Sequence, residues 1–178
     1  INLLIGWNER TDPLVWQPMP TVAERALEKG VSCNVVAAAE YKDTAYTQAT
    51  MRGANFISAD TWDDRFQRAK EIASAKEHSL TYLYIPELDK YGHKSGWTSS
   101  GWAAILEELD AALRGFCSKL PADTGVIITS DHGMMETSDS RQLVLDDLYE
   151  KSGVVKYVGG DTRVNYVYLE SQDSIEQV

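Results

Sequence analysis

Histidine, cysteine and proline are scarce in this chain, and positive charge is in the minority. Its 178 residues include 3 histidines, 2 cysteines and 5 prolines, and 17 lysines and arginines face 27 aspartates and glutamates, for a formal net charge of −10. Such a chain is not expected to hold a nucleic acid polymer or an anionic membrane by general electrostatic attraction. It also lacks a signal-like segment and an apolar run long enough to span a bilayer. We therefore expect neither nucleic acid nor a membrane as a partner.

The two cysteines are too far apart in sequence to suggest a disulfide framework. Cys33 and Cys117 each lie in an apolar stretch, and this pattern favours two buried thiols. Neither the cellular compartment nor the oligomeric state follows from the sequence.

The chain does contain enough apolar sequence for a core. Hydrophobic residues make up 43% and charged residues 25% of it, as in an ordinary globular protein, and its length favours one domain. It opens at Ile1, inside an apolar stretch, and ends at Val178, just after a strand-like run. We interpret residues 1–178 as a single α/β domain that is a piece of a larger one.

Helical and strand patterns alternate along the first two thirds of the chain. Thr21 and Glu24 have the spacing of a capping box, which predicts a helix that runs to Lys29 and ends before Gly30. The stretch before it, Asn8–Pro20, holds three prolines and is predicted to be irregular. Apolar spacing predicts strands at Cys33–Ala38, Leu80–Ile85 and Gly125–Thr129, and helices at Thr47–Arg52, after Asp60 or Thr61, and over Trp102–Leu120. This order favours a mostly parallel sheet between layers of helices.

Further patterns lie at the two ends of the chain. Ile1–Gly6 is apolar and fits a strand, and Leu143–Glu150 fits a helix. Val154–Val158 and Val164–Leu169 flank Gly159–Asp161, a turn signal, and this arrangement predicts a hairpin. The predicted architecture is therefore a three-layer α/β core with a mostly parallel sheet and a C-terminal β-hairpin.

Two of the predicted strands are followed by turns that each carry one aspartate and one histidine. Asp89 and His93 come after the second strand, four residues apart, so that both side chains can face one point on a helical turn or on a loop that doubles back. Asp131 and His132 come after the third strand. Adjacent side chains converge only where the backbone turns, and Gly133 permits a sharp turn there.

Each turn also has a purely structural interpretation. Asp131 can cap the following segment and His132 can pack on the core, while His78, among polar neighbours, is expected at the surface. In parallel sheets, however, ligands bind beyond the carboxyl ends of the strands, and aspartate oxygen and histidine nitrogen are good zinc ligands. The joint pattern favours a metal site at one edge of the sheet, formed by Asp89, His93, Asp131 and His132.

Several segments are similar to those of a known family. Tyr84–Gly96 resembles the metal-binding segment of nucleotide pyrophosphatase/phosphodiesterases, in the alkaline phosphatase superfamily, and Ser130–Met134 resembles their second metal-binding segment. Trp16–Thr21, with the helix after it, resembles the stretch that follows the nucleophile in that family. Met51–Ala54 also stands at a position known from that family. The resemblance covers most of Ile1–Met134 in order.

This resemblance implies an alkaline phosphatase-like core and two divalent ions, usually zinc, with manganese or iron as alternatives. Asp89 and His93 would hold one ion and Asp131 and His132 the other, so that the ions clamp the attacking and leaving oxygens of an in-line displacement. The family's first aspartate, its Thr or Ser nucleophile and its late histidine have no counterpart in this sequence. We therefore assign no catalytic residue and no organic cofactor site. With these ligands missing we expect the ions to bind more weakly to residues 1–178 than to the intact protein, so that an empty site is compatible with this assignment.

The sequence thus predicts a metal-dependent phosphohydrolase, acting on nucleotide-type phosphodiester or pyrophosphate bonds of a small phosphate ester in the intact parent protein. Residues 1–178 alone are expected to be inactive. One alternative is a phosphomonoesterase, phosphomutase or sulfatase of the same superfamily, which shares the ligands and differs in its pockets. The other is a non-catalytic α/β domain with vestigial ligands, which would carry no zinc or manganese when the full-length parent is purified without chelator.

Overall fold

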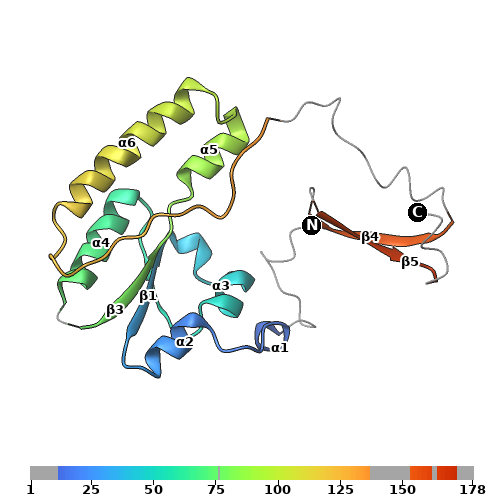
Figure 1. Cartoon of the computed structure of the whole chain (residues 1–178), viewed down its shortest axis with the longest axis horizontal. Helices are drawn as coiled ribbons and strands as arrows, with labels where there is room; N and C mark the ends of the chain where they lie inside the picture. The colour runs from blue at the N-terminus through green and yellow to red at the C-terminus, as the bar shows by residue number, and fades with distance from the viewer. Residues whose placement is uncertain (1–11, 76, 137–152, 162–163, 172–178) are drawn as a thin grey trace. The chain divides into compact units, whose positions relative to one another are not determined.

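The structure is a computed structural model that describes residues 12–75, 77–136, 153–161 and 164–171 (Figure 1). The chain divides into two compact units, Ile1–Met134 and Met135–Val178, and each is described by itself. The strand predicted at Ile1–Gly6 and the helix predicted at Leu143–Glu150 lie outside the described residues.

A three-stranded parallel sheet, in the order β2-β1-β3, forms the centre of the first unit. The strands are β1 (Ser32–Ala37), β2 (Asn55–Ser58) and β3 (Ser79–Leu83). β1 is buried from Cys33 to Ala37 because it has a neighbour on each side. The predicted strands at Cys33–Ala38 and Leu80–Ile85 are confirmed to within two residues. The sequence analysis missed β2, whose four residues begin and end with polar side chains.

Helices cover both faces of this sheet. α3 (Ala45–Thr50) connects β1 to β2, and α4 (Trp62–Ser74) connects β2 to β3. The second connection runs back across β1, so right-handed crossovers place these two helices on opposite faces, as Figure 1 shows. α4 packs on β1 and β3, and α2 (Val22–Leu27) packs on β1. The predicted α/β class with a parallel sheet is confirmed.

Local capping signals account for where α2 begins and ends. The Glu24 backbone N–H donates to Thr21 Oγ1 at 3.1 Å, and the Thr21 N–H donates to Glu24 Oε2 at 2.7 Å. This reciprocal pair satisfies two donors that a helix start leaves unpaired. Gly30 follows the helix with φ of 74°, a left-handed conformation that glycine adopts without a Cβ clash. The predicted capping box and the left-handed Gly30 are confirmed, and the helix ends two residues earlier than expected, at Leu27.

The proline-containing stretch before α2 is not wholly irregular, as the sequence analysis expected. It includes the short helix α1 (Pro13–Trp16), in which Asp12 Oδ1 accepts from the Leu14 N–H at 2.8 Å. Proline is compatible with the first helical position because its missing N–H would have no partner there. The prediction was therefore wrong for these four residues.

Two further helices follow β3 and continue the first unit. A short 3-10 turn, η1 (Ala39–Tyr41), follows β1. α5 (Glu87–Ser95) follows β3, and α6 (Ser100–Cys117) follows α5. The α6 prediction is confirmed, with its end three residues earlier than expected. Phe66 of α4 stacks on Phe116 of α6, with ring centroids 4.9 Å apart. α6 is thus held against α4 as an outer helix.

The strand predicted at Gly125–Thr129 is absent from the structure. Ile127 is 93% exposed and Ile128 is 70% exposed, and Figure 1 draws the segment without an arrow. Among the described residues β3 pairs with β1 alone, and no strand pairs with this segment. An apolar run becomes a strand only when a neighbour satisfies its backbone groups, and the sequence pattern carries no information on that neighbour.

The second unit contains the predicted hairpin. β4 (Val155–Asp161) and β5 (Val164–Leu169) pair antiparallel, and the rings of Tyr157 and Tyr168 stack with centroids 4.4 Å apart. The turn was predicted at Gly159–Asp161, but those residues belong to β4.

The two cysteines and His78 complete the comparison with the sequence. Cys33 is 3% exposed, and burial raises the pKa of its thiol. Cys117, the last residue of α6, is exposed, so its predicted burial was wrong. His78 is exposed, as predicted. No helix among the described residues is both long and apolar enough to cross a membrane.

Candidate metal centre

Asp89 and His93 lie one turn apart on α5, directly after the carboxyl end of β3. Residues four apart share one face of a helix, and the distance from Asp89 Oδ1 to His93 Nε2 is 3.4 Å. The structure therefore has the helical turn, rather than the doubled-back loop, of the two arrangements that the spacing left open.

His132 reaches the same aspartate from the segment that follows α6. Its Nε2 atom lies 3.6 Å from Asp89 Oδ1, and its ring centroid lies 6.4 Å from that of His93. One ligand atom of each of the three side chains lies within 4.8 Å of the other two. Two segments separated by the whole of α6 thus bring two imidazoles and one carboxylate together.

Asp131 does not join this group among the described residues. Its side chain is 92% exposed, and its Oδ1 atom lies 3.9 Å from His132 Nε2. His132 therefore stands between two carboxylates, Asp89 and Asp131, rather than belonging only to its sequence neighbour. The assignment of two ligand pairs to two ions stays a prediction.

The ring of His132 is oriented by the backbone carbonyl of the next residue, Gly133. Its Nδ1 atom lies 2.9 Å from the carbonyl oxygen of Gly133. A carbonyl oxygen only accepts hydrogen bonds, so Nδ1 carries the proton and donates it. In the neutral ring this tautomer leaves the lone pair on Nε2, the atom that lies toward Asp89 and that a metal ion would bind.

The donor set fits a divalent cation. Two imidazole nitrogens and one carboxylate oxygen are the protein ligands of many catalytic zinc sites, which leave a fourth position for water or substrate. The side chains of Asp89, His93 and His132 are 45%, 62% and 37% exposed. The group is thus open to a small molecule.

Gly92 allows the His132 segment to approach α5 closely. A Cβ atom at Gly92 would lie 2.3 Å from Met134 Sδ and 3.4 Å from Trp102 Nε1. Trp102 also donates a hydrogen bond from Nε1 to the carbonyl of Leu88 at 3.0 Å, which ties α6 to α5. The sequence analysis missed this role, and its only signal was a glycine placed directly before His93.

On its outer side, α5 is tied to η1 by an ion pair. Lys90 Nζ lies 2.6 Å from Glu40 Oε1 and 5.3 Å from the centroid of the Tyr41 ring. The hydrogen bond from Lys90 lowers the pKa of Glu40, and the same bond raises the pKa of Lys90. Lys90 therefore stays charged and turned toward η1, although it is adjacent to Asp89 in sequence.

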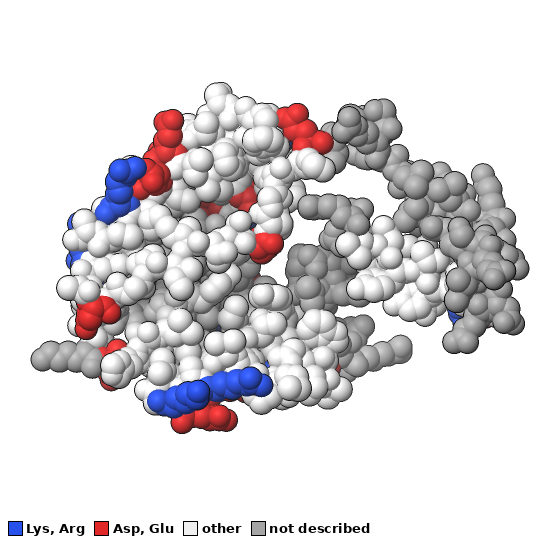
Figure 2. Space-filling view, viewed as in Figure 1, with Lys and Arg blue, Asp and Glu red and all other residues white. Residues whose placement is uncertain are grey.

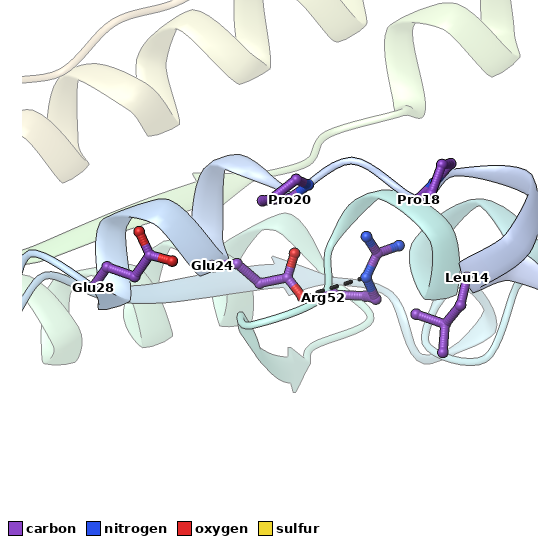
Figure 3. Close-up of a pocket in the computed structure, with 6 residues that line it drawn as sticks. All are labelled: Leu14, Pro18, Pro20, Glu24, Glu28 and Arg52. Carbon is purple, nitrogen blue, oxygen red and sulfur yellow. Dashed lines mark hydrogen bonds and ion pairs between the residues drawn. The ribbon is translucent and has the colours of Figure 1, made fainter.

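A pocket of about 500 Å³ lies elsewhere, between α1, α2 and the end of α3 (Figure 3). Arg52 projects into it and pairs with Glu24 at 3.4 Å, while its other nitrogens donate to the carbonyls of Ala49 at 2.7 Å and Met19 at 2.9 Å. Because the Arg52 guanidinium already binds these protein groups, its place in the pocket is explained by its structural contacts. None of its lining residues belongs to the candidate metal centre.

The surface charge is dispersed on the face seen in Figure 2. Acidic and basic side chains appear there singly or in small groups, and the described residues form no broad basic patch on this face. This face therefore offers little electrostatic attraction for a polyanion.

Comparison with known proteins adds information of a different kind. The model of the family described as type I phosphodiesterase / nucleotide pyrophosphatase matches residues 5–178. The chain is 27% identical over 121 residues to an uncharacterized pyrophosphatase/phosphodiesterase of Schizosaccharomyces pombe, a match covering 65% of this chain and 25% of that protein. It is 30% identical over 106 residues to the mouse bis(5'-adenosyl)-triphosphatase, covering 55% of this chain and 23% of the mouse protein.

A third relative is named for a different reaction. The chain is 29% identical over 127 residues to a phosphopentomutase of Rhizobium meliloti, covering 70% of this chain and 29% of that protein. The chain thus spans about a quarter of the length of these curated relatives. No solved structure matches it.

Proposed function

The chain belongs to the type I phosphodiesterase/nucleotide pyrophosphatase family of hydrolases, and we propose that its Asp89, His93 and His132 hold a divalent ion used in phosphoester hydrolysis. The observation that carries this proposal is the convergence of these three side chains, from two separate segments, within 4.8 Å of one another. Zinc suits the mixed nitrogen and oxygen ligands, and manganese and iron are the alternatives.

Each side chain has a defined part in the proposed site. Asp89 contributes negative charge between the two imidazoles, α5 fixes the spacing of Asp89 and His93, and the Gly133 carbonyl sets the tautomer of His132. A bound ion of this class polarises a phosphoryl oxygen and makes a bound water or hydroxyl more acidic. The exposure of the three side chains leaves room for a phosphate ester beside them.

Metal stoichiometry tests the two-ion arrangement implied by the resemblance. His132 Nε2 lies 3.6 Å from Asp89 Oδ1 and 3.9 Å from Asp131 Oδ1, so it can ligate on either side. Under the two-ion proposal Asp131 and His132 hold the second ion. Calorimetric titration of the chain with zinc gives two equivalents, one of them lost in Asp131→Asn, if Asp131 and His132 hold a second ion. It gives one equivalent, retained in Asp131→Asn, if Asp89, His93 and His132 share a single ion.

Zinc affinity tests the proposed site itself. Asp89→Asn keeps the shape of the side chain but removes the charge that faces both imidazoles. We expect at least a tenfold weaker affinity, because altering even a group that only orients a ligand costs about 10–100-fold. The matched control is Asp110→Asn, which removes the same charge from an exposed pair with Arg114 on α6. Competition with a zinc-binding dye measures both. Equal affinity of the original chain and Asp89→Asn would refute the site.

The substrate class follows from the relatives and is proposed for the whole protein, because the chain spans only about a quarter of their length. We expect the intact protein to hydrolyse a nitrophenyl phosphodiester and nucleotide pyrophosphates, with activity lost in chelator and restored by zinc. We expect no turnover by the 178 residues alone. Zinc-dependent turnover by this short chain, lost in Asp131→Asn, would contradict its inactivity.

The phosphopentomutase relative supports a second candidate function, the transfer of phosphate within a sugar phosphate. The two functions share their metal ligands and differ in the substrate. Parallel assays of the intact protein on a phosphodiester, a phosphomonoester and a pentose phosphate separate them. Isomerisation of the sugar phosphate without diester hydrolysis would favour the mutase.

A further inference from the structure

Arg65 is the most deeply buried charged side chain among the described residues, with 1% of its surface exposed. It lies in the first helical turn of α4, and its guanidinium nitrogens donate to three backbone carbonyls: Tyr84 at 2.8 Å, Asp60 at 3.0 Å and Thr61 at 3.1 Å. Both terminal nitrogens also bind the carboxylate of Glu87. A bidentate ion pair of this kind fixes the relative orientation of the two side chains as well as their distance.

These contacts join the candidate metal centre to the sheet. Asp60 and Thr61 follow β2, and Tyr84 follows β3. Glu87 is the first residue of α5, two positions before Asp89. One planar cation thus links the ends of two strands to the first turn of the helix that carries Asp89.

This link acts at the first residue of α5. Pro86 occupies the cap position, and in the part of the chain that the structure describes it supplies no side-chain cap. In the same turn Trp102 bonds the carbonyl of Leu88 and Lys90 pairs with Glu40 of η1, and Met134 lies at Gly92 in the next turn. Glu87 also carries negative charge where the helix dipole favours it. The pair with Arg65 is the contact that joins the first residue of α5 to the ends of β2 and β3.

We propose that Arg65 is a positioning residue of the metal centre, which acts through Glu87 to hold α5 so that Asp89 faces both His93 and His132. This inference rests on the proposed metal site. A purely stabilising role for the Arg65–Glu87 pair predicts only that its loss destabilises the fold. The positioning role also predicts that its loss weakens metal binding in a chain that stays folded.

The decisive variant is Glu87→Gln. It keeps the size of the side chain and leaves Arg65 its three carbonyl bonds, so the fold is expected to persist, as judged by circular dichroism and a cooperative thermal transition. Zinc affinity of the 178-residue chain is expected to fall about 10–100-fold, the usual effect of altering a group that orients a ligand. The matched control is Glu71→Gln, which removes a carboxylate from an exposed pair with Arg68 on α4. It should leave zinc affinity unchanged.

A second series varies the cation. Arg65→Met removes the buried charge, and Arg65→Lys keeps the charge without the planar fork, so affinity is expected to rank original chain, then lysine, then methionine. Histidine side-chain NMR locates the effect. Zinc should shift the signals of His93 and His132 but not those of the exposed His78, and Glu87→Gln should require proportionally more zinc for the same shift.

The outcomes separate this inference from the function on which it rests. Zinc binding by the original chain, with equal affinity in a folded Glu87→Gln, overturns the role of Arg65 and leaves the metal centre standing. Absence of zinc binding by the original chain overturns both. Loss of affinity in Glu71→Gln as great as in Glu87→Gln also overturns the role of Arg65, because it shows a general effect of charge.

Discussion

Glu24 shows how one side chain couples local and tertiary structure. It accepts a hydrogen bond from the Thr21 backbone N–H at 2.7 Å and pairs with Arg52 at 3.4 Å. The Thr21 bond is the main reason that the pKa of Glu24 is lowered, and Arg52 adds to the effect. A carboxylate whose pKa is lower in the folded than in the unfolded chain stabilises the fold above its unfolded pKa. That stabilisation is lost as the pH falls through the folded pKa.

We therefore predict that Glu24→Gln lowers the free energy of unfolding at pH 7, and that the difference from the original chain shrinks below about pH 4, where unfolded glutamate becomes protonated. Urea unfolding at pH 7 and pH 3 measures both values. Glu28→Gln, at the end of the same helix, removes the same charge and serves as the control. An equal loss in Glu24→Gln at both pH values would show that charge is not the cause.

At the residue scale, the sequence predicted which side chains lie close together better than it predicted which of them would share an ion. Asp89, His93 and His132 were all among the four predicted ligands, because strand ends and turn residues can be recognised locally. Asp131 is different: adjacent side chains diverge, and only the backbone angles decide which one faces α5. The role proposed for Arg65 could not be predicted, because its partners Tyr84 and Glu87 lie 19 and 22 residues away in sequence.

At the element scale, the confirmed predictions depend on local signals. The capping box of α2 and the apolar spacing of α4 and α6 are contained in consecutive residues. A strand depends instead on its neighbour. β1 is buried between two others, whereas Ile127, in an equally apolar run, is 93% exposed because no described strand lies beside it.

This difference in burial predicts a small loss of stability for one alanine substitution and a large loss for another. Ile127→Ala should change the free energy of unfolding by no more than about 0.5 kcal/mol, as at exposed positions generally. Phe66→Ala should cost about 3–5 kcal/mol, because Phe66 is 6% exposed and stacks on Phe116. Chemical denaturation of the 178-residue chain measures both. A loss of more than about 2 kcal/mol in Ile127→Ala would mean that the segment is buried as the strand first predicted.

At the scale of the whole molecule, the proposed ion would connect parts of the chain that are far apart in sequence. Asp89 and His93 belong to α5, whereas His132 belongs to the segment after α6. The unfolded chain holds these ligands far apart, so an ion bound to all three stabilises the folded state. The stabilisation grows with the concentration of free metal relative to its dissociation constant.

We therefore predict that zinc raises the melting temperature of the chain. Zinc at 100 times its dissociation constant adds about 2.7 kcal/mol, which corresponds to a rise of about 5–10 °C for a chain of this size. The rise should shrink at acid pH, because protons compete with the metal for the ligands. His132→Ala should abolish it, whereas His78→Ala, which removes an exposed histidine outside the group, should preserve it. An undiminished rise in His132→Ala would place the bound zinc elsewhere on the chain.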